Sequence, residues 1–223
     1  MKFNIKKILH LLGIILLSLI FCISFYYLII NIYHDAAMNK KVFVSSDNVY
    51  YKKYQSNIDI IKTNLDNYSY NKNKYKYDSN IMNNFYNKVN YCYNILVKSN
   101  IIINENTFLG YKEVNELNNE FINLFVDKCF TTNLLWIGNL TNSNLKEQFN
   151  NAKFSIDILT NNSLYLRNEL KDNSSYYYNT DYFNQKIRNN LESSYQLILH
   201  NYSDFSKIIM DLSNYLTRGE RSD

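Results

Sequence analysis

Residues 8–33, with the sequence ILHLLGIILLSLIFCISFYYLIINIY, decide the architecture of this chain. No charged residue lies between Lys7 and Asp35. A helix of about 20 apolar residues crosses the roughly 30 Å hydrocarbon core of a lipid bilayer, and this run is longer than that. Its C-terminal part carries Tyr26 and Tyr27, whose amphipathic rings favour the depth of the headgroups. The run therefore predicts one transmembrane helix and a single-pass protein.

A cleaved secretory signal is the competing interpretation of this stretch. Cleavage requires an apolar run of about 7–15 residues that ends at a pair of small residues. Cys22 and Ser24 form such a pair, but the apolar run continues through Ile30, past the point where cleavage would fall. We therefore expect an uncleaved signal-anchor helix.

Charge around the anchor predicts its orientation. Three lysines and the amino terminus precede the apolar run, whereas Asp35 comes before the first lysine on the other side. Positive flanks favour the cytoplasm. We expect residues 1–7 to form a short cytoplasmic tail and the rest of the chain to be extracytoplasmic.

The part beyond the anchor is large enough to fold alone. It has 189 residues from Asp35 onward, and a body of that size buries about 70% of the surface of its unfolded chain. We divide it into a stalk over residues 34–47, a helical-bundle domain over 48–219 and a tail over 220–223. Proline is absent and only four glycines occur, so long helices meet few breakers.

The charge of this body excludes one class of partner. Three of the 24 basic residues precede the anchor, which leaves 21 basic against 20 acidic residues after it. Binding to a phosphate backbone requires a basic patch, and neither the total nor any long run supplies one. We expect no nucleic-acid partner.

Apolar residues recur at helical spacing through most of the body. The first predicted helix ends near residue 70, and the next three cover residues 79–98, 111–137 and 145–170. The last one follows a loop over 172–180 and ends near Leu216. The expected inward-facing residues of the first two helices are Tyr51, Tyr54, Ile58, Ile61, Leu65 and Tyr68, then Ile81, Phe85, Val89, Cys92 and Leu96.

The other three predicted helices carry longer stripes. In the third helix these residues are Val114, Leu117, Phe121, Leu124, Thr132 and Leu135. The fourth has the most regular set, with Leu145, Phe149, Ala152, Ile156, Leu159, Ser163, Leu166 and Leu170. The stripe of the fifth includes Phe183, Ile187, Leu191, Ile198, Phe205, Ile209, Leu212 and Leu216.

These patterns predict an all-α fold, in which an antiparallel bundle of four to five long amphipathic helices follows the anchor. Narrow apolar stripes are typical of bundles and coiled coils with crossing angles near 20°. No segment alternates with a period of two for long enough to indicate a sheet. The β-branched run Ile101–Ile103 lacks a partner strand, so we interpret it as part of a connection.

No catalytic or metal-binding pattern is present. A di-metal bundle requires a Glu-x-x-His pair on each of two helices, and no glutamate stands three positions before His10, His34 or His200. Zinc-protease, phosphate-loop and nucleophile-elbow motifs are missing too. We interpret His200 as a half-buried bundle residue and expect no catalytic, cofactor or metal site and no enzyme activity.

Cys92 and Cys129 are candidates for a disulfide if the body is extracytoplasmic. In a simple hairpin, Cys92 lies about 9 Å before the end of one helix and Cys129 about 27 Å into the next. Bridged Cα atoms lie within about 7 Å of one another. This geometry predicts two free cysteines, unless the following helix starts much later.

Two functions fit such an architecture. The first is a membrane-anchored interaction or assembly module, for example of a cell-envelope complex, which pairs with a protein partner or with itself through helix faces. The alternative is an extracytoplasmic sensory or ligand-binding bundle that signals through a partner. The lipid bilayer is a partner in both cases.

Overall fold

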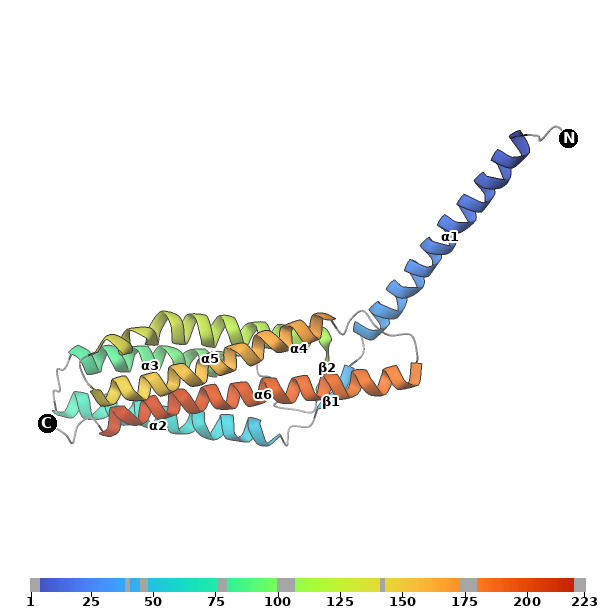
Figure 1. Cartoon of the computed structure of the whole chain (residues 1–223). Helices are drawn as coiled ribbons and strands as arrows, with labels where there is room; N and C mark the ends of the chain where they lie inside the picture. The colour runs from blue at the N-terminus through green and yellow to red at the C-terminus, as the bar shows by residue number, and fades with distance from the viewer. Residues whose placement is uncertain are drawn as a thin grey trace.

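The computed structural model describes residues 5–38, 41–44, 48–75, 80–99, 107–140, 143–172 and 180–218. A long helix, α1 (Ile5–Met38), projects away from an elongated bundle of helices (Figure 1). The predicted all-α fold with a helical bundle is confirmed. One small sheet lies where the bundle and α1 meet.

Helix α1 is exposed from Lys6 to Leu28. Its segment Lys6–Ile32 is long and apolar enough to cross a membrane, and none of its most apolar window is buried in the structure. Side chains such as Leu17 and Phe21 are 68% and 71% exposed. The helix extends three residues before and five beyond the predicted span, because residues 34–38 continue it instead of opening a stalk.

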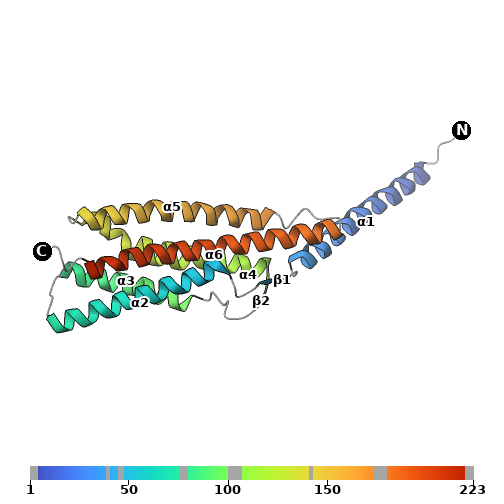
Figure 2. The same cartoon turned by 90° about the horizontal axis from the view of Figure 1, so that it is seen from below.

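The bundle consists of α2 (Val49–Tyr75), α3 (Asn80–Lys98), α4 (Tyr111–Glu120), α5 (Ser143–Asp172) and α6 (Thr180–Arg218). Between α4 and α5 the chain continues as a π-helix, η1 (Phe121–Leu134), and a 3₁₀-helix, η2 (Leu135–Asn139). Consecutive long helices alternate in direction (Figures 1 and 2). Helix α2 continues to Tyr75, about five residues beyond the predicted end near residue 70.

The most extensive contact between two helices is a parallel one, between α2 and α6. Amide groups of α2 donate hydrogen bonds to α6 at increasing positions along both: Asn57 Nδ2 to Ser206 Oγ at 2.9 Å and Asn64 Nδ2 to Ser213 Oγ at 2.8 Å. Acceptors and donors each recur after seven residues, as in a coiled coil. Consecutive helices of the bundle are antiparallel, as predicted, and because five such passes alternate in direction, the first and the last point the same way (Figure 1).

The predicted apolar stripes of α5 and α6 are confirmed. All eight predicted residues of α5 are buried, as are the six members of the α6 stripe from Leu191 to Leu216. The side chains of Phe183 and Ile187 lie outside the described residues. On α2 and α3 the stripes are also inward, except that Ile81 is 52% exposed.

Ser163, the one polar member of the α5 stripe, joins three helices. Asn118 of α4 donates from Nδ2 to its backbone oxygen at 3.0 Å, and Asn201 of α6 donates from Nδ2 to its Oγ at 2.9 Å. All three residues are buried. Because a lost partner would leave a buried amide unsatisfied, this layer favours one register of α4, α5 and α6.

The π-helix η1 overturns part of the predicted stripe of the third helix. Thr132 and Leu135 are exposed rather than buried. A π-helix bonds i to i+5 and has more residues per turn than an α-helix, so side chains beyond Phe121 point elsewhere than a 3.6-residue period predicts. Its buried residues are mostly doublets spaced by four: Phe121 and Ile122, Phe125 and Val126, Cys129 and Phe130, followed by Leu134.

The aromatic rings of η1 pack against α6. The ring centroid of Phe125 lies 4.9 Å from that of Tyr202 and 5.0 Å from that of Phe205, and Phe121 touches the same two rings. Aromatic pairs at such distances add about 0.5–1.5 kcal/mol beyond the burial of their area. This cluster holds the π-helix against α6.

A two-stranded antiparallel sheet was not predicted from the sequence. Strand β1 (Lys41–Val44) lies within the expected stalk and pairs with β2 (Thr107–Gly110), with Lys41 opposite Gly110 and Val44 opposite Thr107. Four residues are too few to show a period-two pattern, and the two strands are far apart in sequence. Residues 101–103, interpreted as a connection, lie outside the described residues.

An ion pair reinforces this sheet. Lys41 Nζ lies 2.5 Å from Glu113 Oε1, and the other carboxylate oxygen accepts a hydrogen bond from the Gly110 N–H at 3.1 Å. The hydrogen bond from Lys41 is the largest effect and holds the Glu113 pKa below its ordinary value; burial, the second-largest effect, raises the pKa, and backbone hydrogen bonds lower it further. The segment that follows α1 is therefore tied to the start of α4.

This ion pair predicts a pH dependence of stability. Because the pKa of Glu113 is lower in the folded than in the unfolded protein, its contribution is present above the unfolded pKa and is lost as the pH falls through the folded pKa. We expect Glu113→Gln to cost up to about 1 kcal/mol at pH 7 and little at pH 3, since the pair is partly exposed. Urea unfolding of both proteins at the two pH values measures this. An equal loss at both would contradict it.

Cys92 of α3 and Cys129 of η1 form a disulfide, so the prediction of free cysteines is wrong. Their Cα atoms are 5.1 Å apart and both residues are fully buried. The predicted hairpin assumed that the second helix starts level with the end of α3. Eleven residues separate Ser99 from Tyr111, the last four of which pair with β1, and such a segment can span about 36 Å. The start of α4 therefore lies farther along the bundle than the end of α3, which brings the two cysteines level.

Candidate interaction surface on α5 and α6

The face of α5 turned away from the core is unusually apolar for a solvent-facing surface. Phe154, Ile158 and Tyr165 are 69%, 44% and 64% exposed, and the neighbouring Leu164 is 43% exposed. Helix α5 lies along one outer edge of the bundle, with α2 along the opposite edge (Figure 2). Scattered exposed apolar residues are ordinary, whereas large ones aligned on a single helix face indicate a contact surface.

We call this face the α5 outer face and define it by six residues in order along the helix: Asn151, Phe154, Ile158, Asn161, Tyr165 and Asn168. It lies opposite the buried α5 stripe, because a residue two positions after a buried one in an α-helix points away from the core. Only the inward stripe of α5 was predicted from the sequence, and this second one was not. Its signal was available as a further set of residues at alternating steps of three and four.

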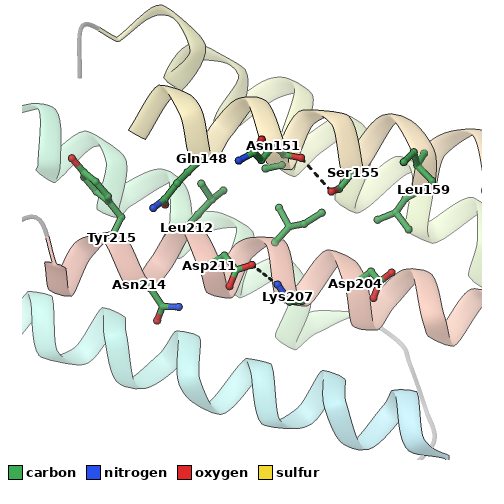
Figure 3. Close-up of a pocket in the computed structure, with 13 residues that line it drawn as sticks. Gln148, Asn151, Ser155, Leu159, Asp204, Lys207, Asp211, Leu212, Asn214 and Tyr215 are labelled. Atoms are coloured by element: carbon green, nitrogen blue, oxygen red, sulfur yellow. Dashed lines mark hydrogen bonds and ion pairs between the residues drawn. The ribbon is translucent and has the colours of Figure 1, made fainter. Parts of the chain in front are cut away.

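A groove of about 640 Å³ adjoins the α5 outer face, between the first half of α5 and the second half of α6 (Figure 3). Its apolar lining includes Ala152 and Leu159 of α5 and Ile208 and Leu212 of α6. It extends from Gln148 to Leu159 on α5, a rise of about 16 Å. Because Ile158 and Asn151 also line it, the groove and the α5 outer face form one continuous surface.

Polar residues surround the apolar lining of the groove. Gln148, Asn151 and Ser155 contribute from α5, and Asp204, Lys207 and Asp211 from α6. Lys207 Nζ pairs with Asp211 Oδ2 at 2.6 Å, so these two charges compensate each other (Figure 3). The Asp204 carboxylate contacts only the imidazole of His200 among the ion pairs found in the described residues, at 3.4 Å. The α6 side of the groove is thus weakly acidic.

His200 has the environment that the sequence predicted. It is half-buried, and its ring packs edge-on against that of Tyr50 with centroids 4.9 Å apart. Its Nδ1 faces Asp204 one turn later on the same helix. No serine, threonine or cysteine is recorded within hydrogen-bond distance of this imidazole among the described residues. The arrangement suits a packing role at the surface of the bundle.

The other two histidines belong to α1. His10 lies on the exposed part of α1, and the side chain of His34 lies outside the described residues. Among the residues that the structure describes, no group of three His, Cys, Asp or Glu side chains is arranged to hold a metal ion.

Two buried tyrosines link neighbouring helices through their hydroxyl groups. Burial raises the pKa of Tyr54 to about 12, despite the opposing hydrogen bond with Ser99, and its hydroxyl donates to the backbone oxygen of Leu96. Burial likewise raises the pKa of Tyr202 well above the ordinary value, and this hydroxyl donates to the Leu117 backbone oxygen at 3.2 Å. Both phenols stay protonated at neutral pH and link neighbouring helices.

Comparison with protein-family models, with curated proteins and with solved structures finds no match for this chain. We therefore infer the function from the geometry of the molecule.

Proposed function

We propose that this protein is a single-pass membrane-anchored interaction module, whose helical bundle assembles with protein in a complex such as one of the cell envelope. The observation that carries this proposal is the α5 outer face, where three large apolar side chains point away from a complete core. Solvent exposure of Phe154, Ile158 and Tyr165 is unfavourable, and burial against another chain would relieve it.

Anchoring by α1 is the second part of the proposal. All apolar side chains of its middle turns are exposed, and nothing in the described bundle covers them. A lipid bilayer would solvate them, whereas water would not. We regard the helix as an uncleaved signal-anchor, because its apolar run continues past the pair Cys22 and Ser24.

We further propose that the bundle is extracytoplasmic. Lysines precede the anchor without any acidic residue, which favours a cytoplasmic amino terminus. The disulfide between Cys92 and Cys129 supports the same side, since cytosolic thiols are ordinarily kept reduced. A non-catalytic role fits the environment of His200 and the high pKa values of the buried tyrosines.

A photoreactive residue tests the interaction function in intact membranes. Placed at Ile158, it is expected to form a covalent adduct with protein on illumination, because that side chain lies on the α5 outer face. The matched control is Gln55, an exposed residue of α2 on the opposite edge of the bundle. Adducts from Ile158 at least about tenfold more abundant than from Gln55 would agree with a buried contact surface. No protein adduct from Ile158 would contradict the function.

The groove favours one alternative, an extracytoplasmic sensory or ligand-binding bundle. Its apolar lining and its Asp204 carboxylate suit a small molecule with an apolar body and a cationic or hydrogen-bond-donating group. Such a ligand would raise the melting temperature of the protein, and Ser155→Phe, at a partly buried position that lines the groove, would abolish that rise. Signalling would then pass through the membrane helix of a partner.

A further inference from the structure

The α5 outer face has the spacing of a coiled-coil seam. Its six residues, from Asn151 to Asn168, follow one another at steps of three, four, three, four and three. Two helices pair in parallel when such positions repeat with an average of 3.5 residues, and each side chain packs between those of its partner. The buried stripe on the opposite side of α5 already packs within the bundle, so the outer seam is available to another chain.

The chemistry of this seam is self-complementary. No charged residue stands at any of its six positions, so two identical faces meet without opposing like charges. In a parallel, in-register pair, Phe154 faces its own copy and Asn161 faces its own copy. Paired asparagine amides can hydrogen-bond to each other, and a buried polar position in a coiled coil fixes register and the number of strands.

The exposed apolar area of the seam suits a pair of chains that share one membrane. Phe154, Ile158, Tyr165 and the adjacent Leu164 expose roughly 400 Å² per chain, given side chains of about 150–250 Å². A stable dimer in solution buries about 800 Å² per partner. Tethering both copies to one bilayer through α1 raises their effective concentration, which compensates for the smaller area.

From these observations we infer that the α5 outer face binds a second copy of the same chain, as a parallel α5–α5 pair between two molecules anchored in one membrane. This inference rests on the proposed interaction function and names the partner. Both bundles are tethered at the same end, beside β1, so copies that stand away from one membrane present their α5 helices in the same direction (Figure 1).

Cysteine crosslinking in membranes tests this pairing. The background is the full chain with Cys22→Ser, which removes the exposed free thiol and keeps the buried disulfide. Phe154→Cys and Asn161→Cys, about 10 Å apart along the helix, are each expected to form a disulfide-linked dimer under mild oxidation. The matched control is Lys153→Cys, exposed on the same helix but turned away from the seam.

A charge at the seam gives a second measurement. Phe154→Asp, combined with Asn161→Cys, is expected to lower the dimer yield at least about tenfold, because it puts two carboxylates opposite each other in an apolar contact. Phe154 is mostly exposed within one chain, so the substitution should leave the fold of the bundle intact. Unchanged helical content and melting temperature of the variant are the control for folding.

The possible outcomes separate the pairing from the general function. Linkage at both seam positions, weak linkage at Lys153→Cys and its loss with Phe154→Asp would support the parallel pair. Linkage at Asn161→Cys alone, or equal linkage at Lys153→Cys, would overturn it. If Ile158 photocrosslinks only to a different protein, self-pairing is wrong and the interaction function stands. If Ile158 crosslinks to no protein, the interaction function itself is wrong.

Discussion

Replacing Leu17 and Phe21 with arginine is expected to remove the protein from the membrane fraction. Both side chains lie near the middle of α1 and are exposed in the structure. Each arginine at the centre of a transmembrane helix costs about 2.5–3.5 kcal/mol of insertion free energy, so the pair costs about 5–7 kcal/mol. Because Leu17 and Phe21 are 68% and 71% exposed, packing within the bundle would not compensate for this cost. Carbonate extraction of membranes, followed by detection of the full-length chain, measures this.

The matched control is Leu17→Ala with Phe21→Ala, which keeps α1 apolar and should leave the protein in the membrane pellet. An intact mass of the wild-type protein distinguishes a retained anchor from a cleaved signal. Protease added to intact cells is expected to degrade the bundle of the wild-type protein, since we place it outside. Full-length wild-type protein in the aqueous extract would contradict anchoring, and a protected bundle would contradict the orientation.

Removing the disulfide is expected to have the second-largest effect, a loss of about 4 kcal/mol in the free energy of unfolding for Cys92→Ala with Cys129→Ala. The two cysteines are 37 residues apart, and a crosslink that closes a loop of this length restricts the unfolded chain by about that amount. Both side chains are also fully buried, so their replacement leaves a small cavity beside η1. Urea unfolding in detergent, followed by circular dichroism, measures the difference.

Cys22→Ala is the control for this experiment, because Cys22 is exposed on α1 and forms no disulfide. It should leave the free energy of unfolding of the bundle unchanged. Labelling of thiols in the unfolded, unreduced protein reports the oxidation state directly. Three reactive thiols per chain instead of one, with stability unaffected by the double replacement, would contradict the disulfide and remove its support for an extracytoplasmic bundle.

Features that depend on neighbouring residues could be predicted from the sequence. The uncharged run around Leu17 specifies an exposed apolar helix by its length alone. The α5 stripe from Leu145 to Leu170 is buried at every predicted position, because the 3.6-residue period relates side chains that share one face. The half-buried state of His200 agrees with its predicted place in the last helix of the bundle.

The candidate surface was only partly predictable. The steps of three and four from Asn151 to Asn168 are visible in the sequence, yet whether another helix of the bundle covers this second stripe is not. Burial of Ser163 and exposure of Phe154 answer that question, because Asn118 and Asn201 hold Ser163 inside. The groove beside this face depends on the distance between α5 and α6, which local patterns do not encode.

The sequence by itself determined that this chain has one long apolar helix followed by amphipathic helices, because both features arise from local length and periodicity. Only the tertiary structure decided which distant segments meet: β1 with β2, Cys92 with Cys129, and α2 with α6 in parallel. Those pairings depend on where each connection places the next helix and on the i to i+5 bonding of η1. Neither the course of a connection nor the bonding of η1 is determined by the neighbouring residues alone. The contacts of the whole bundle therefore select these pairings.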